Sequence, residues 1–161
     1  MKKTKGQKGF TLIEILVVIG IIAILAAVVL IAINPAKQFA QARNSQRTSN
    51  VNAILNAIGQ RMTDNKGVFE GPFNIAGVDY DCGVLPNSTT TITTATTTAS
   101  GALGCLVPTY ISDLPTDPTY VSGTDTLYYV YKDSAGRVHV CASLAKTEVA
   151  LPSPAEICVT R

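Results

Sequence analysis

Charge and histidine are scarce in this sequence. Only 15% of the 161 residues are charged, the formal net charge is +2, and His139 is the single histidine. One histidine and four cysteines without a Cys-x-x-Cys pair give a metal cluster little support. No glycine-rich phosphate loop or nucleophile elbow is present, so we predict no enzymatic activity. The low net charge also argues against nucleic-acid binding.

Apolar residues, in contrast, make up 47% of the chain, and they concentrate near its start. Residues 15–33 carry no charge, which is enough apolar length for a helix to cross a bilayer. Four lysines come before this run: Lys2, Lys3, Lys5 and Lys8. Because basic flanks stay on the cytoplasmic side, we expect the N-terminus inside and everything after Asn34 outside. The run is longer than the apolar core of a secretory signal, which favours retention in the membrane.

The apolar run is entered through the sequence Lys-Gly-Phe-Thr-Leu-Ile-Glu, residues 8–14. This segment resembles the class III signal of type IV prepilins and of the pseudopilins of type II secretion systems. The resemblance implies that a prepilin peptidase cuts between Gly9 and Phe10 and then methylates the new Phe10 amine. It makes residues 1–9 a leader peptide and residues 10–33 a transmembrane and assembly helix.

Glu14 is an acidic residue at the edge of the apolar run. A carboxylate in hydrocarbon costs about 3 kcal/mol or more, so it needs a partner unless it lies in the headgroup zone. The resemblance places Glu14 against the Phe10 ammonium of an adjoining subunit, a pairing that would set the register of stacked helices. Cleavage would remove four of the 13 basic residues and leave nine against 11 acidic ones, a side-chain charge of −2. A role for nucleic acid is therefore not expected.

The remaining chain predicts an α+β fold. Helix-compatible residues continue to about Met62, with an interruption at Pro35, so residues 34–62 form an amphipathic second half of one long helix. Residues 63–161 predict an extracytoplasmic domain with a small antiparallel sheet, the arrangement of the pilin fold. Its expected strands are residues 73–78, 126–132, 137–143 and 157–160, the middle two forming a hairpin.

Residues 87–100 form a threonine-rich insertion within that domain. Because Ile92 is its one large apolar side chain, we expect a protruding hairpin or loop that contributes little to the core. Asn87 starts an Asn-Ser-Thr acceptor pattern, so surface glycosylation is the alternative use of this segment.

Four cysteines in an exported domain predict two disulfides with three connectivities. We favour Cys82 with Cys105, closing the threonine-rich loop, and Cys141 with Cys158, which resembles the C-terminal disulfide loop of many pilins. Residues 110–118 and 128–131 resemble the β-region of major pseudopilins, some of which bind calcium nearby. This makes Asp117 and Asp125 candidate calcium ligands, with Asp113 and Asp133 as further options. No other cofactor is expected.

Taken together, these patterns favour the structural subunit of an extracellular type IV pilus. The precursor would lie in the cytoplasmic membrane, meet the prepilin peptidase and an inner-membrane assembly platform, and end as a homopolymer on the cell surface. Two alternatives remain: a major pseudopilin of a type II secretion system, and a membrane-anchored binding domain that never polymerises.

Overall fold

The computed structural model describes the chain from Gly9 to Arg161, apart from the side chains of Ile31 and Ala32. The predicted leader therefore lies outside the described residues, except for Gly9. Two compact units make up the chain, one ending at Gln38 and the other running from Phe39 to Arg161. Each unit is described by itself.

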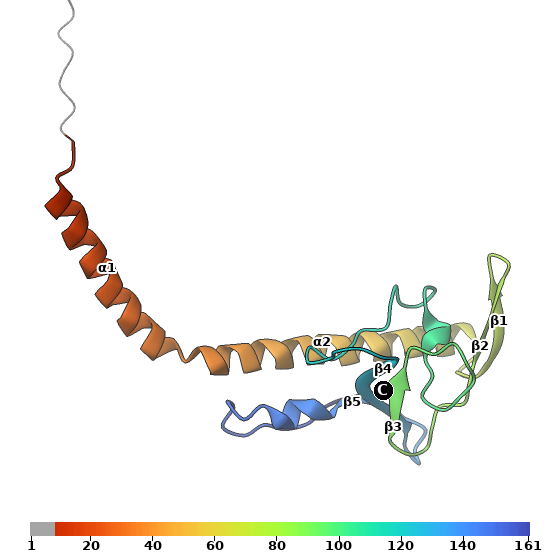
Figure 1. The fold of residues 1–161 in the computed structure, drawn as a ribbon. Coiled ribbons are helices and arrows are strands. Elements are labelled where there is room, and N and C mark those ends of the chain that lie inside the picture. Colours follow the sequence, from red (N-terminus) through yellow and green to blue (C-terminus); the bar gives the residue numbers. More distant parts are fainter. Residues whose placement is uncertain (1–8) are drawn as a thin grey trace, which may run out of the picture. The chain divides into compact units, whose positions relative to one another are not determined.

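The first unit contains α1, an α-helix over Leu12–Ile33 (Figure 1). Thr11 caps its start, since the Thr11 hydroxyl accepts a hydrogen bond from the backbone N–H of Glu14 at 3.3 Å. Its apolar side chains cover the whole circumference, and none of the residues in Leu12–Leu30 is buried. By length and composition this helix can cross a membrane.

A break at Asn34 separates α1 from the next helix, α2, which runs over Pro35–Asp64. Asn34 has a left-handed backbone (φ 48°), and its side-chain and main-chain oxygens accept hydrogen bonds from Lys37 N at 3.3 and 3.1 Å. Asn34 thus ends one helix and caps the other. Pro35 occupies the first position of α2, where a missing N–H costs nothing. The break lies where the sequence predicts an interruption.

The second unit packs a four-stranded sheet on α2 (Figure 1). Its antiparallel order is β3 (Thr90–Thr93), β4 (Asp125–Lys132), β5 (Val138–Ala142) and β6 (Ile157–Thr160). The predicted β4–β5 hairpin and the last strand are confirmed. Helix and sheet bury one apolar core, whose largest contributors include Val51, Ile54, Leu55, Ile58, Ile92, Leu106, Tyr128, Val130 and Val140. Two short 3-10 helices connect the strands: η1 (Gly104–Leu106) lies between β3 and β4, and η2 (Ser143–Thr147) lies between β5 and β6.

The prediction of one strand over residues 73–78 is wrong. The structure has a two-stranded hairpin there, β1 (Gly71–Ile75) and β2 (Val78–Cys82), beside the C-terminal end of α2 (Figure 1). Ala76 and Gly77 both have positive φ, 53° and 84°, and form the tight turn between the strands. Such a turn matches the right-handed twist of the strands it joins, which explains its place in a hairpin.

The threonine-rich segment also departs from expectation, because it belongs to the sheet and the core. β3 pairs with β4, and Ile92 is completely buried. The backbone that follows β3 passes close to two glycines. A Cβ on Gly83 would lie 2.7 Å from the carbonyl carbon of Thr98, and a Cβ on Gly104 would lie 2.5 Å from the carbonyl oxygen of Ala95. The segment is therefore held by close backbone packing.

We expect Gly104→Ala to lower the free energy of unfolding by about 1–3 kcal/mol, because the added methyl overlaps a backbone that has little room to move. Thermal unfolding of the disulfide-bonded full-length chain in detergent, followed by circular dichroism, measures this. Gly59→Ala is the matched control: a Cβ there meets only the end of the Arg161 side chain, and a helix favours alanine. Equal melting temperatures for Gly104→Ala and wild type would contradict the close packing.

Candidate functional site

The residues around the predicted cleavage junction are open to solvent in the monomer. Gly9 has nothing within 4 Å of where a Cβ would stand, and Phe10 is 79% exposed. Glu14 is exposed in the first turn of α1, where the positive end of the helix dipole favours a carboxylate. Among the described residues Glu14 makes no ion pair. The junction is thus accessible, and the acid is available to a partner.

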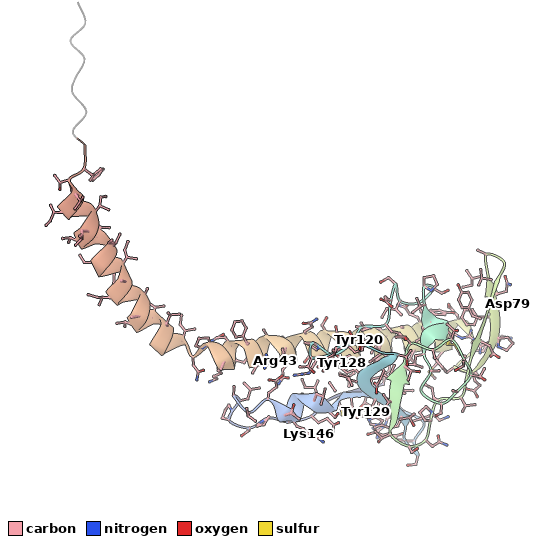
Figure 2. The ribbon with its side chains drawn as sticks, in the orientation of Figure 1. Arg43, Asp79, Tyr120, Tyr128, Tyr129 and Lys146 are labelled. Atoms are coloured by element: carbon pink, nitrogen blue, oxygen red, sulfur yellow. A yellow bond between two sulfur atoms is a disulfide. The ribbon has the colours of Figure 1, made fainter. Side chains whose placement is uncertain are left out.

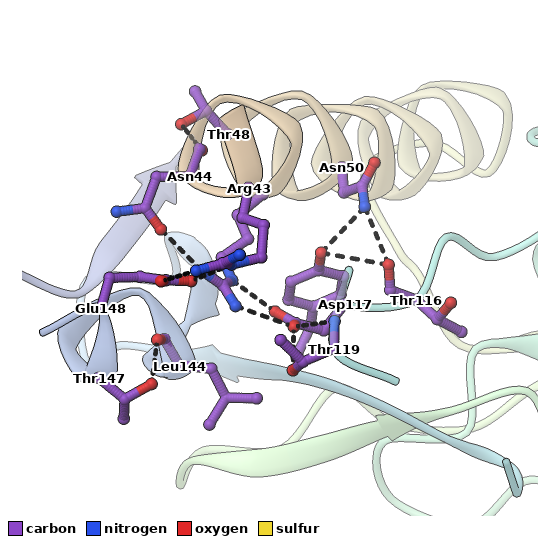
Figure 3. Close-up of polar contacts among 12 residues, drawn as sticks. Arg43, Asn44, Thr48, Asn50, Thr116, Asp117, Thr119, Leu144, Thr147 and Glu148 are labelled. Carbon is purple, nitrogen blue, oxygen red and sulfur yellow. Dashed lines mark hydrogen bonds and ion pairs between the residues drawn. The ribbon is translucent and has the colours of Figure 1, made fainter. Parts of the chain in front are cut away.

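A second feature is a buried polar cluster between α2 and the sheet domain, which Figure 3 shows in close-up. Arg47 is completely buried on α2. Its guanidinium donates to both Asp117 oxygens, from Nε at 2.7 Å and from Nη2 at 3.0 Å. Nη1 donates to Glu148 at 2.5 Å and to Asn44 at 2.8 Å. All three nitrogens are therefore satisfied, as a buried guanidinium requires.

Glu148 also accepts hydrogen bonds from Arg43, which lies one turn before Arg47 on α2. Arg43 Nε donates to Oε1 of Glu148 at 2.8 Å, and Arg43 Nη2 contacts Oε2. In Figure 2 the Arg43 side chain lies on the side of α2 that faces the sheet domain. Because Glu148 follows η2, the two arginines hold this C-terminal segment against the helix. Buried ion pairs of this kind fix an arrangement more than they add stability.

These contacts shift the pKa values of both acids. The hydrogen bond from Arg43 lowers the pKa of Glu148 to about 2, with burial opposing it and Arg47 assisting. Burial by itself would raise the pKa of Asp117, but hydrogen bonds from Arg47 and Thr119 outweigh it and hold that pKa below its usual value. Both acids are therefore ionised at neutral pH.

A smaller set of hydrogen bonds extends the cluster along α2. Asn50 donates through its amide nitrogen to the Tyr128 hydroxyl at 2.9 Å and to the Thr116 carbonyl at 3.0 Å (Figure 3). Thr116 lies in the segment that precedes Asp117, so this loop is tied to the helix at two neighbouring points. Asn50 on α2 thus positions the loop that precedes β4.

The candidate calcium ligands are not brought together as free carboxylates. Both Asp117 oxygens accept from Arg47, and one also accepts from Thr119. Asp125 accepts from the N–H of Leu127 at 2.7 Å, supporting a bulge where Leu127 has a positive φ of 64°. Asp133 binds the turn and side chain of Arg137 and the ring of His139. Each of these three acids therefore has a structural hydrogen-bonding role, and calcium binding stays a prediction from the sequence.

The two disulfides join the same cysteines that the sequence favours. Cys82 is bonded to Cys105, next to Gly83 and Gly104, and Cys141 is bonded to Cys158 across β5 and β6. They close loops with separations of 23 and 17 residues, which corresponds to about 3 kcal/mol each in the loop-entropy account. Glu156 approaches Cys141 and Cys158, but oxidised sulfurs are not thiolate ligands for a metal.

Comparison with known proteins identifies the N-terminal segment. Residues 4–30 match a family described as the prokaryotic N-terminal methylation motif. The match includes the predicted cleavage junction, Glu14 and most of α1. No solved structure matches the chain significantly. The motif is characteristic of type IV pilins and pseudopilins, so it supports a precursor of the pilin type that is anchored in the membrane before assembly.

Acid should weaken the domain between about pH 4.5, near the unfolded-state pKa of a glutamate, and about pH 2. Because the folded-state pKa of Glu148 is lowered, its contribution is present above this window and is lost as pH falls through it. We expect the melting temperature of Glu148→Gln, followed by circular dichroism, to fall less steeply over this range than that of wild type.

Glu156→Gln is the control for this measurement, because Glu156 is exposed and makes no ion pair among the described residues. Its melting temperature should follow that of wild type at every pH. A Glu148→Gln profile parallel to that of wild type would show that the cluster is not the source of the acid sensitivity.

Proposed function

We propose that this precursor, which begins with the methylation motif of pilin-type proteins, is the structural subunit of an extracellular type IV pilus. The leader is removed between Gly9 and Phe10, the Phe10 amine is methylated, and the mature subunits polymerise through α1. The protein acts by assembly, with no enzymatic turnover, and its sheet domain is displayed on the outside of the filament.

The observation that carries this proposal is the contrast between α1 and the rest of the chain. The second unit buries its own core between α2 and the sheet, whereas the motif-bearing α1 exposes every apolar side chain that the structure describes. In water such a surface would cost about 25 cal/mol per Å². A bilayer covers it in the precursor, and the same helix from neighbouring subunits covers it in a filament.

Glu14 supplies the register of this assembly. A new ammonium on Phe10 and the exposed carboxylate of Glu14 are each costly in an apolar bundle, and paired between subunits they neutralise each other. Stacked helices that are out of register leave both charges unpaired. The pair therefore selects one axial position over its neighbours.

The second candidate is a major pseudopilin of a type II secretion system. It is favoured by the resemblance of residues 110–118 to the pseudopilin β-region, within which Asp117 binds Arg47. Both candidates share the cleavage and the helical assembly. Negative-stain microscopy of sheared cell-surface material separates them, because a pilin yields long filaments and a pseudopilin yields short periplasmic assemblies.

Glu14→Gln tests the proposal in cells that carry a working prepilin peptidase and assembly machinery. We expect mass spectrometry to show a methylated Phe10 at the start of both wild type and variant. Filaments in the sheared fraction should fall at least about tenfold for Glu14→Gln, because the buried ammonium loses its partner. Glu156→Gln, the same change on the sheet domain, should assemble as wild type does.

Two results would contradict the proposal. Retention of Met1 in native membranes despite an active peptidase would favour the membrane-anchored domain that does not polymerise. Equal filament yields from Glu14→Gln and wild type, with correct processing, would remove the charge pair from the account.

A further inference from the structure

A cleft of about 600 Å³ that is lined mostly by polar residues lies against the last turns of α2, in the second unit. One wall is the helix itself, with Asn56, Gln60 and Asp64 spaced four residues apart and hence on one face. The facing walls come from Tyr110 and Arg161, which lie far apart in the sequence. Three separate segments of the second unit therefore converge on one cleft.

The backbone around the cleft is firmly held. The N–H of Tyr110 donates to the Leu106 carbonyl at 2.8 Å, and the Tyr110 ring packs edge-on against Phe73 with centroids 5.9 Å apart. The main chain of Arg161 exchanges hydrogen bonds with Val138 at 2.8 and 3.0 Å, continuing the sheet. The cleft is thus largely formed before any ligand arrives, as binding sites usually are.

The absence of a side chain at Gly59 leaves room for the Arg161 guanidinium. A Cβ on Gly59 would lie 3.2 Å from Nη1 of Arg161, so the guanidinium lies across the helix at the position where a side chain is missing. The guanidinium thus lies over a helix position five residues before Asp64, about one and a half turns away, within the same cleft. The charged side chains that line the cleft are one cation, Arg161, and one anion, Asp64, so their charges balance.

The polar groups of the cleft are largely uncommitted. Thr63 uses its hydroxyl on the Gly59 carbonyl at 2.8 Å, within the helix. The side chains of Asn56, Gln60 and Asp64, the Tyr110 hydroxyl and the Arg161 guanidinium make no hydrogen bond with any residue from 9 to 161. Amides both donate and accept, the carboxylate accepts and the guanidinium donates. The cleft therefore offers several hydrogen bonds of both senses beside an aromatic ring.

We propose that this cleft binds a neutral saccharide. Sugar hydroxyls donate and accept at close spacing, which matches two amides flanked by a carboxylate and a guanidinium. The apolar face of a sugar ring suits the tyrosine ring. A volume of about 600 Å³ lies within the usual range of small-ligand sites. Because every residue of the cleft belongs to the second unit, binding needs no polymer.

Saturation-transfer NMR on the full-length chain tests this, in a detergent whose headgroup is not a sugar. The probes are the methyl glycosides of glucose, galactose, mannose and N-acetylglucosamine, with sialic acid as the charged comparison. We expect at least one neutral glycoside to bind at millimolar concentration and sialic acid not to bind. Binding of none of the neutral glycosides, or of sialic acid alone, would overturn the proposal.

Variants then locate the binding. Gln60→Ala and Asp64→Asn should each weaken the affinity of the bound glycoside about fivefold, the effect of one lost hydrogen bond. Gln46→Ala removes an exposed amide from the same helix outside the cleft and should leave the affinity unchanged. Equal affinities for Gln60→Ala, Asp64→Asn and wild type would place the sugar elsewhere. All measurements use unpolymerised protein, so their outcome does not depend on filament formation.

Discussion

The constraint on which everything else in this chain depends is an apolar helix that its own domain does not cover. α1 is apolar all around, so no orientation against a single sheet could bury it. The second unit buries a core of its own without α1, because α2 contributes one apolar stripe and the sheet covers that stripe. This separation leaves α1 free to enter an apolar environment such as a bilayer while the second unit keeps its own fold.

Within the folded domain, polar and apolar contacts have different tasks. The apolar stripe from Val51 to Ile58 supplies the burial that favours folding. Arg47, one turn before the stripe, fixes which loops lie beside the helix, because it can be satisfied only when Asp117 and Glu148 both reach it. A misplaced loop would leave a buried charge unpaired, which costs several kcal/mol. Specific placement of the domain's long loops follows from this one residue.

The sequence predicts those features of the fold that short-range patterns encode. The methylation motif, the break before Pro35, the β4–β5 hairpin with its Asp-Ser-Ala-Gly turn and the last strand all have short-range signals. The turn between β1 and β2 was missed because Ala76 adopts a left-handed conformation that alanine seldom takes. The neighbouring Asn74 and Gly77, whose N–H donates to the Asn74 side chain, are the turn residues that could have indicated it.

The two disulfide pairings were predicted, but two other long-range features, the Arg47 cluster and the packing of the threonine-rich segment, were missed for a different reason. Arg47 meets partners 70 and 101 positions away, and no spacing rule links residues at such distances. The threonine-rich segment looked featureless because its order comes from Gly83 and Gly104, which lie outside it. Charged residues that interrupt an otherwise apolar or small-residue helix face, as Arg47 does, are the signal that could have directed attention to the cluster.

Gly83 and Gly104, beside the Cys82–Cys105 disulfide, differ from the glycine at the β1–β2 turn in how much space surrounds them. At Gly83 and Gly104 even one extra carbon meets backbone, whereas beside Gly77, at the tip of the β1–β2 hairpin, the space is open. Insertions should therefore be tolerated at that hairpin tip, while Gly77 itself keeps a positive φ of 84° that favours glycine. The hairpin tip is thus a place in this fold where chain length can change without altering the apolar core.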